Sequence, residues 1–520
     1  MRKTARWLDK ISPALVLILI SSVAVAQDKA PGSLPPDQAS ALDRITADSL
    51  KGHLSFLASD LLEGRDTPSR GLDLAAEYIA AQFRRAGLEP VGDDGYFQTA
   101  NWQLEESDPS SFRLEITADG KSIPVDKDRV SLPRPAGLDV QKAGILKVDY
   151  KAAKDLKEED VAGKVVLVEL PDPRKVEQAE QAATFRAIGQ FQSRMRAARP
   201  AAILNVSRDL DAASGLGSGR LIDPASPPAP GASGGLTAIT VHDPAVTKLF
   251  EAMPVGSASA TVSIRLDAPA PRPVKLRNVV GLLRGSDPEL KESYVMVTAH
   301  YDHIGVRGPA GTDRIYNGAN DDGSGTVSVV ELATALASLK EKPRRSILFA
   351  TFFGEEKGLL GSRYYGRNPM VPVEKTVADV NLEQVGRTDD SEGPQVSSAF
   401  LTGFGYSDVS KVFVEAGEAE GVKVFRHPTN SDAFFGRSDN QALADLGVPA
   451  HTLGIAFMFP DYHGAADHWD KVDYANMAKV DRMVARALLM IANDPEAPKW
   501  DESNPKAAKY LKAWKERHAK

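Results

Sequence analysis

Strand-like and helix-like segments alternate along the chain from Leu276 onward. The apolar runs "YVMVTA", "SILFATFF", "VADVNL" and "AHTLGI" are short and mostly rich in β-branched or aromatic residues, which is typical of buried strands. Two intervening stretches, "DGSGTVSVVELATALASL" and "KGLLGSRYYG", have the spacing of helices. Strands that alternate with helices predict an α/β sheet with helices on both of its faces.

The first half of the chain has a different pattern. Two amphipathic helices are predicted over 42–65 and 71–88, and the second meets Gly87, a favourable C-cap residue. Further on, short β-rich pieces such as "GKVVLVEL" and "AAILNVS" are separated by loops rich in Gly, Pro and Ser. This pattern predicts a separate β-rich domain over 112–275.

The N-terminus has the pattern of an export signal. Basic residues precede the apolar segment "ISPALVLILISSVAVA", which ends in a small-x-small site. We expect residues 1–26 to be a signal peptide, followed by a polar linker to about Ala39. An uncleaved anchor helix is the alternative, but the segment is shorter than the ~20 apolar residues that span a bilayer. The expected location is periplasmic or secreted, with no stable membrane contact after cleavage.

Composition narrows the possible partners and ligands. The chain of 520 residues, long enough for more than one domain, has 63 Lys and Arg against 70 Asp and Glu. The resulting net charge of −7 gives no case for nucleic-acid binding. Cysteine is absent from the sequence, which excludes disulfides and thiolate ligands. Any metal must therefore be held by histidine and carboxylate side chains.

Possible metal ligands follow several of the predicted strands, where ligands bind in open α/β sheets. Adjacent glutamates end "ILFATFFGEE", and two charges after so apolar a strand are costly unless cations compensate them. Two histidines and three carboxylates can hold two divalent ions if one carboxylate bridges them and a position stays open for water. The remaining glutamate would act as a general base. The candidate residues are His300, Asp321, Glu355, Glu356, Glu383 and His463.

Five segments, "AHYDHIG", "NGANDDGSG", "FFGEEKGLLGS", "NLEQVGR" and "DYHGAADH", have the order and spacing of one enzyme family. Over about 39–493 the chain resembles the zinc-dependent exopeptidases that include bacterial leucyl aminopeptidase, aminopeptidase Y and glutamate carboxypeptidase. The resemblance implies a mixed, mostly parallel central sheet flanked by helices, in a peptidase domain formed by 27–111 and 276–495. The inserted section, 112–275, resembles a protease-associated (PA) domain. The charged tail, 496–520, is predicted to form a surface helix.

The resemblance also implies a role for each candidate. One carboxylate would bridge two zinc ions, a histidine and a glutamate would complete each site, and a further glutamate would pass a proton from water to the leaving amine. His300 and Glu383 would complete one site, Glu356 and His463 the other, and Asp321 would bridge the two ions. Glu355 would be the acid/base. Asp302 would orient His300. Many relatives carry aspartate in place of Glu383. The longer side chain of glutamate can change how many of its oxygens bind the metal and how the substrate is positioned.

Other residues near these motifs receive lesser roles. His303 is predicted to be structural or to line the pocket, and Asp322 to lie at a helix N-terminus. His468 is the main alternative to the second ligating histidine. Arg387 and Arg437 are weaker candidates for contacting a substrate carboxylate.

We therefore hypothesise an exported di-zinc aminopeptidase that hydrolyses the N-terminal peptide bond of peptides. Three alternatives stay open: a carboxypeptidase on the same scaffold, a glutaminyl cyclase with one metal, and a non-catalytic protein that binds through its PA domain. The complete set of ligands disfavours the last two. A serine hydrolase is the weakest competitor, because "GASGG" matches the G-x-S-x-G motif within a Pro- and Gly-rich loop and not in a strand–turn–helix.

Overall fold

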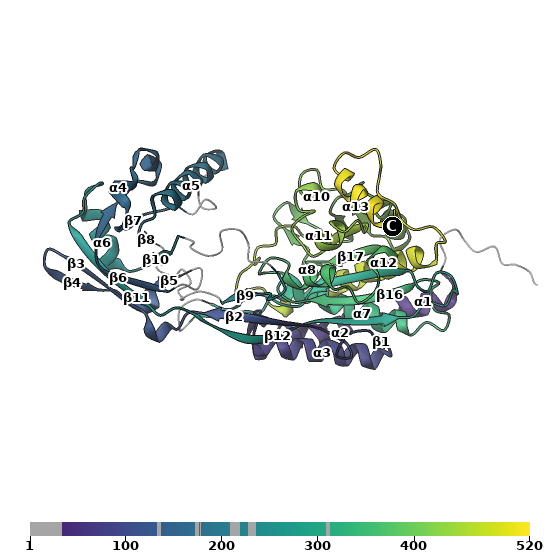
Figure 1. Cartoon of the computed structure of the whole chain (residues 1–520). Coiled ribbons are helices and arrows are strands. Elements are labelled where there is room, and N and C mark those ends of the chain that lie inside the picture. Colours follow the sequence, from purple (N-terminus) through teal and green to yellow (C-terminus); the bar gives the residue numbers. More distant parts are fainter. Residues whose placement is uncertain are drawn as a thin grey trace, which may run out of the picture.

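The computed structural model describes residues 34–132, 137–171, 176, 178–208, 219–226, 236–307 and 312–519. The predicted signal peptide and the "GASGG" match lie outside these residues. Within the described ranges, no helix is long and apolar enough to cross a membrane. The chain forms two lobes, each built on its own β-sheet (Figure 1).

The first lobe contains a ten-stranded mixed sheet. Parallel pairing joins the central strands, and the pairs on the side of β12 are antiparallel. The prediction of a mixed α/β sheet flanked by helices is confirmed, with the parallel part in its centre. In spatial order the strands are β21 (Lys423–Phe425), β20 (Ser398–Leu401), β22 (Ala450–Gly454), β17 (Thr376–Leu382), β13 (Tyr294–His300), β16 (Ser346–Phe352), β12 (Ala270–Leu283), β2 (Phe97–Glu106) and β9 (Arg220–Ile222), with β1 (Glu89–Pro90) beside β12.

Helices cover both faces of this sheet, since successive side chains of a strand point to opposite faces. In β13, Val295 and Val297 pack into one apolar cluster, while Met296 packs into another on the opposite face. The first cluster includes residues of α2 (Ala47–Leu57), α3 (Arg70–Ala86), α7 (Gly325–Ala337), α9 (Val409–Glu420) and α12 (Tyr474–Asn493). The second includes residues of α8 (Leu360–Arg367), α11 (Asn440–Ala444) and α13 (Ala508–His518), and Figure 1 shows α10 (Asn430–Ala433) on the same side.

The second lobe contains an eight-stranded sheet with apolar clusters of its own. Among the described residues, these clusters share no member with those of the first lobe. Its strands are, in spatial order, β4 (Lys121–Pro124), β3 (Arg113–Ala118), β11 (Ala260–Leu266), β6 (Leu138–Lys147), β7 (Val165–Val168), β8 (Ala202–Val206), β10 (Ala238–Val241) and β5 (Val130–Ser131). Its helices are α4 (Glu158–Val161), α5 (Gln178–Ala198) and α6 (Pro244–Ala252).

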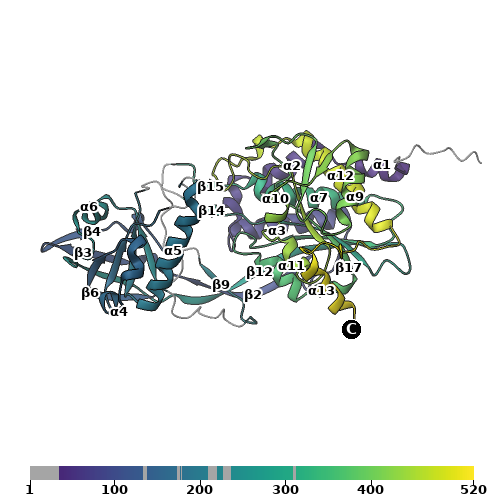
Figure 2. The same cartoon turned by 90° about the horizontal axis from the view of Figure 1, so that it is seen from above.

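A long antiparallel pair of strands connects the lobes (Figure 1 and Figure 2). β2 and β12 pair from Phe97 opposite Val279 to Glu106 opposite Ala270. The first residues of β12 are exposed and its last residues are buried, so this strand enters the core of the first lobe along its length. Apart from β9, which pairs with β2, the described strands and helices between β2 and β12 build the second lobe.

The N-terminal helices follow the predictions in part. The helix predicted over 71–88 is confirmed, because α3 begins after a Ser69 side-chain cap and ends at Gly87, where φ is 78°. The helix predicted over 42–65 is shorter, because Thr46 caps α2 and a 3-10 turn follows it. Helical structure also begins earlier, with α1 (Pro36–Leu42) inside the predicted linker. The surface helix expected in the tail is present as α13.

Candidate metal centre

Four of the predicted donor residues lie at or beyond the carboxyl ends of neighbouring parallel strands. His300 is the last residue of β13, Glu383 directly follows β17, and Glu355 and Glu356 come shortly after β16. In the parallel register of β13 and β16, His300 lies opposite Phe352, the final residue of β16. Because these strands end at the same edge of the sheet, they bring four polar side chains to one place.

The other two donor residues come from loops at this edge. Asp321 lies in the turn Ala319–Ser324 before α7 and is 2% exposed. The N–H groups of Asn320 and Asp321 both donate to the carboxylate of Asp467, at 2.9 and 3.1 Å. His463 lies in the loop after β22, where its ring stacks on Tyr462 with the centroids 4.1 Å apart. Hydrogen bonds thus fix the turn that carries Asp321, and stacking orients His463.

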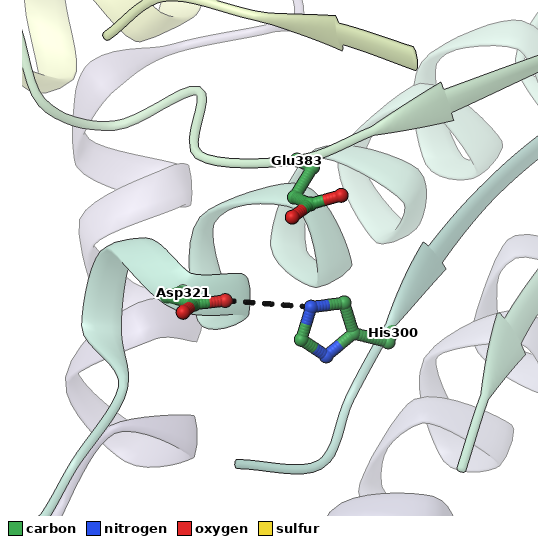
Figure 3. A group of neighbouring side chains, drawn as sticks. All are labelled: His300, Asp321 and Glu383. Carbon is green, nitrogen blue, oxygen red and sulfur yellow. Dashed lines mark ion pairs between the residues drawn. The ribbon is translucent and has the colours of Figure 1, made fainter. Parts of the chain in front are cut away.

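Figure 3 shows His300, Asp321 and Glu383 around one small space. One possible ligand atom of each lies within 4.8 Å of the other two. His300 Nε2 is 3.4 Å from Asp321 Oδ1. These residues come from β13, from the turn before α7 and from the end of β17, so only the folded sheet brings them together.

A second group shares Asp321 with the first. His463 Nε2 lies 3.1 Å from Asp321 Oδ2 and 3.2 Å from Glu356 Oε1. Ligand atoms of His303, Asp321 and Glu356 also lie within 4.8 Å of one another, and His303 Nδ1 is 2.8 Å from Glu356 Oε1. His303, which the sequence assigns to a structural or pocket-lining role, therefore lies among the possible ligands.

Several of these donor atoms are buried without a hydrogen bond. Among the described residues they include His300 Nε2, Asp321 Oδ2, Glu356 Oε1 and Glu383 Oε2. A buried polar atom without a partner is costly and calls for a specific explanation. Divalent cations bound in the two groups would satisfy all four atoms, and imidazole nitrogen with carboxylate oxygen is a ligand set that zinc accepts. The residues present therefore fit a zinc centre.

Burial and charge shift the proton affinities of the three glutamates differently. Burial holds the pKa of Glu355 well above its usual value, against the favourable charge of His300. Burial likewise raises the pKa of Glu383 to about 7. For Glu356, burial and the charge of Asp321 are outweighed by the adjacent rings of His303 and His463, which lower its pKa to about 2. Crowded acids that resist ionisation are stabilised as carboxylates when cations lie beside them.

Asp302 lies beside His300, although its contact differs in detail from the expected one. The Asp302 carboxylate oxygen Oδ1 is 3.5 Å from His300 Nδ1, while the backbone carbonyl of Asp302 is within hydrogen-bonding distance of that nitrogen, at 3.2 Å. The carboxylate accepts the N–H of Glu355 (3.0 Å) and the hydroxyl of Thr67 (3.2 Å). Asp302 thereby connects the loop that carries Glu355 to the end of β13.

Two further buried acids position the site. The carboxylate of Asp322 accepts the N–H groups of His300 (3.4 Å), Gly325 (3.0 Å) and Gln384 (3.2 Å), and so links β13, α7 and the end of β17. Its bond to Gly325 agrees with the predicted place at a helix N-terminus. The other acid, Asp467, is missed by sequence reasoning, and its place in the motif "DYHGAADH" is the only signal for it.

Arg387 and His468 make other contacts. The guanidinium of Arg387 is paired with Asp389 at 2.5 Å and with Asp461 at 2.9 Å, so it is already engaged by carboxylates of the chain itself. His468 Nε2 lies 3.4 Å from Asp313. These contacts weaken the case for Arg387 as a substrate-binding residue and for His468 as a ligand.

Residues 278–488 match the model of peptidase family M28. Over this segment the chain is similar to peptidase family M28. All six candidate catalytic and metal-binding residues lie within it. The resemblance that the five motifs indicate is thereby confirmed.

The chain is also similar to curated fungal proteins. The chain is 39% identical over 139 residues to a probable zinc metalloprotease of Leptosphaeria maculans, which covers 26% of this chain and 30% of that protein. It is 26% identical over 254 residues to leucine aminopeptidase 2 of Arthroderma otae, and this match covers 43% of this chain and 47% of that protein. The chain thus spans less than half the length of these relatives.

A solved structure resembles nearly the whole chain. The aminopeptidase from Aneurinibacillus sp. strain AM-1 superposes with a TM-score of 0.57 at 18% identity, covering 89% of this chain and 97% of that one. At this identity the likeness concerns the fold. It extends beyond the M28 segment to most of both lobes.

Proposed function

We propose that the chain is a di-zinc aminopeptidase that hydrolyses the N-terminal peptide bond of peptides. The observation that carries the proposal is the pair of donor groups that share Asp321 and contain buried, unsatisfied ligand atoms. His300 and Glu383 would hold one ion, Glu356 and His463 the other, and Asp321 would bridge them. The similarity to proteins named zinc metalloprotease and leucine aminopeptidase supports the choice of metal and of reaction.

The chain's own residues would bind the peptide and move the proton. Bound zinc supplies Lewis acidity, which polarises a carbonyl and lowers the pKa of water toward neutrality. Glu355 lines the cavity beside the donors, and its carboxylate lies 4.0 Å from His300 Nε2. Burial raises its pKa, and a group that accepts and returns a proton is most effective when its pKa lies near the working pH. Glu355 would take the proton from water and deliver it to the departing amine.

The shape and charge of the cavity support cleavage at a chain end. The cavity has a volume of about 310 Å³, near the lower limit of roughly 300–1,000 Å³ for ligand pockets, so it suits a terminal residue better than the middle of a long peptide. Its wall includes the carboxylates of Asp321, Glu355 and Glu383. Such a wall attracts the ammonium group of a free N-terminus.

Two neighbouring glutamates allow a sharp test of the proposal. Glu355→Gln should retain about two zinc ions per chain and lose activity on unblocked aminoacyl p-nitroanilides by about 10²–10⁴-fold, since it removes the proton-transferring group. Glu356→Gln, the matched variant, should bind about one zinc ion fewer. Metal analysis beside activity measures both. Zinc lost with Glu355→Gln would make Glu355 a ligand, and undiminished cleavage of N-acetylated peptides would rule out an aminopeptidase.

A carboxypeptidase is the second candidate, because Arg437 lines the same cavity and could bind a C-terminal carboxylate. The peptide Phe-Gly-Gly-Gly-Leu separates the two reactions. Release of phenylalanine identifies an aminopeptidase, and release of leucine identifies a carboxypeptidase.

We further propose that the chain is exported with removal of residues 1–26, and that 112–275 is a PA domain. The basic residues and apolar run at the N-terminus support the first statement, and the β-rich composition of the inserted section supports the second. N-terminal sequencing of protein recovered from a bacterial periplasm should begin at Gln27. An intact Met1 would contradict cleavage.

A further inference from the structure

The cavity beside the donors has a large apolar and aromatic wall. The rings of Phe400 and Phe457 stack with centroids 3.5 Å apart, and Phe434 packs against Phe457 at 5.3 Å. Met458 and Tyr462 also line the cavity and are 48% and 43% exposed. A wall of this kind stabilises a bulky apolar side chain by removing its surface from water.

Arg437 is the one lysine or arginine among the described residues that line this cavity. It lies in the loop after α10, and its guanidinium is 4.7 Å from the ring centroid of Phe434. Within the described ranges this guanidinium has no ion pair or hydrogen bond with another side chain, whereas that of Arg387 is paired with two aspartates. Arg437 is also exposed, so a ligand can reach it.

The charges of the cavity wall therefore have two signs. Asp321, Glu355 and Glu383 are acidic and belong to the proposed catalytic centre, while Arg437 supplies a cation stacked on the aromatic wall. A short peptide is a zwitterion that also carries both signs of charge, since its ammonium group precedes the first peptide bond and a carboxylate follows it. Arginine binds carboxylates through paired, charge-assisted hydrogen bonds.

We infer that Arg437 binds a carboxylate on the residue that follows the cleaved bond, so that the preferred substrates are short peptides with a bulky apolar first residue and a negatively charged second residue. The carboxylate is either the C-terminus of a dipeptide or an acidic side chain. The inference rests on the proposed function, because it assumes cleavage after the first residue. Arg437 is then a specificity-determining residue.

The first experiment compares kcat/KM for matched substrates of the zinc-loaded protein. Phe-Ala should exceed Phe-Ala amide by about tenfold or more if Arg437 binds a terminal carboxylate. Phe-Glu amide should exceed Phe-Gln amide by a similar factor if it binds an acidic side chain. Either preference supports the inference, and the absence of both overturns it while leaving an aminopeptidase in place. Cleavage of N-acetyl-Phe-Ala without cleavage of Phe-Ala would instead overturn the aminopeptidase proposal.

The second experiment tests whether Arg437 causes the preference. Arg437→Gln should reduce the ratio of acid to amide to within about twofold of unity, and Arg437→Lys should keep part of it because a single charge remains. Arg426→Gln is the matched control, since Arg426 pairs with Asp432 and does not line the cavity. An unchanged ratio in Arg437→Gln overturns the inference.

Binding measured without turnover gives an independent readout. In the Glu355→Gln background, calorimetry should show Phe-Ala binding about tenfold more tightly than Phe-Ala amide. The added Arg437→Gln substitution should remove this difference. Equal affinities in the background variant would contradict a role for Arg437 in carboxylate binding.

Discussion

At the scale of single residues, two histidines compete for one position in the proposed metal centre. His463 Nε2 approaches carboxylate oxygens of both Asp321 and Glu356, at 3.1 and 3.2 Å. Within the described chain, Glu356 is the one acid with which His303 forms an ion pair, and His303 Nδ1 lies 2.8 Å from its carboxylate. We expect His463→Ala to lose about one zinc ion and His303→Ala to retain both, as measured by metal analysis after dialysis. The reverse result would make His303 the ligand.

Sequence patterns predict the strand-end residues of the site better than its loop residues. His300 and Glu383 are predictable because an apolar run fixes where each strand ends, and parallel strands end at one edge. The location of His303 next to Glu356 depends on how the chain turns after β13, which no periodicity reports. The same holds for Asp467, whose carboxylate is placed by the fold of a loop and accepts backbone N–H groups from a distant turn.

At the scale of elements, a buried acid lies between two helices of the first lobe. Ser328 on α7 donates to Asp481 on α12 at 2.9 Å, and burial raises the pKa of Asp481 to about 8. Because the folded state prefers the protonated acid, stability is greatest below the unfolded pKa, near 4, and falls as the pH rises through about 8. Asp481→Asn removes this dependence.

The gain in stability from Asp481→Asn should grow by roughly 3–4 kcal/mol between pH 5 and pH 8. Urea unfolding at several pH values measures it. Asp128→Asn is the control, since Asp128 is exposed. If the difference in unfolding free energy between Asp481→Asn and the wild type stays constant with pH, the assigned titration of Asp481 is contradicted.

Two helical glycines provide a matched pair for the packing of the N-terminal helices. A Cβ on Gly71, in the first turn of α3, would lie 1.7 Å from the carbonyl oxygen of Leu62, whereas one on Gly52, in α2, would meet nothing within 4 Å. Gly71→Ala should therefore cost about 1–3 kcal/mol of unfolding free energy. Gly52→Ala should gain about 0.5–1 kcal/mol through helix propensity. Equal effects of the two substitutions would mean that α3 can move away from Leu62.

Elements with a strong internal pattern are predicted more accurately than elements stabilised by a partner. α3 has a polar cap, a regular apolar stripe and Gly87, and its bounds are close to those predicted. β12 begins at Ala270, before Leu276, where the predicted alternation of strands and helices starts, because its first half is exposed and is held by pairing with β2. Local sequence does not record such pairing, since the two strands are far apart in the chain.

At the scale of the whole molecule, the apolar clusters of the two lobes are separate in the described chain, while the proposed metal centre belongs to the first lobe alone. Removing zinc with a chelator leaves buried carboxylates such as Asp321 and Glu383 facing one another, which destabilises that lobe. Calorimetry should show two unfolding transitions. The midpoint temperature of one should fall by several degrees and return when zinc is added, while that of the other should stay unchanged. A common shift of both transitions would indicate that the lobes unfold together.

The register of β2 and β12 has a consequence for how the protein could change in evolution. Glu106 and Ala270 face each other as partners, so the points where the chain leaves and re-enters the first lobe are only about 5 Å apart. In topological terms, the whole second lobe is a long hairpin loop. A two-residue turn in its place would close the same hairpin, and among the described strands only β9 would be lost from the sheet of the first lobe. Such a module can be gained, lost or exchanged while the path through the metal centre stays the same.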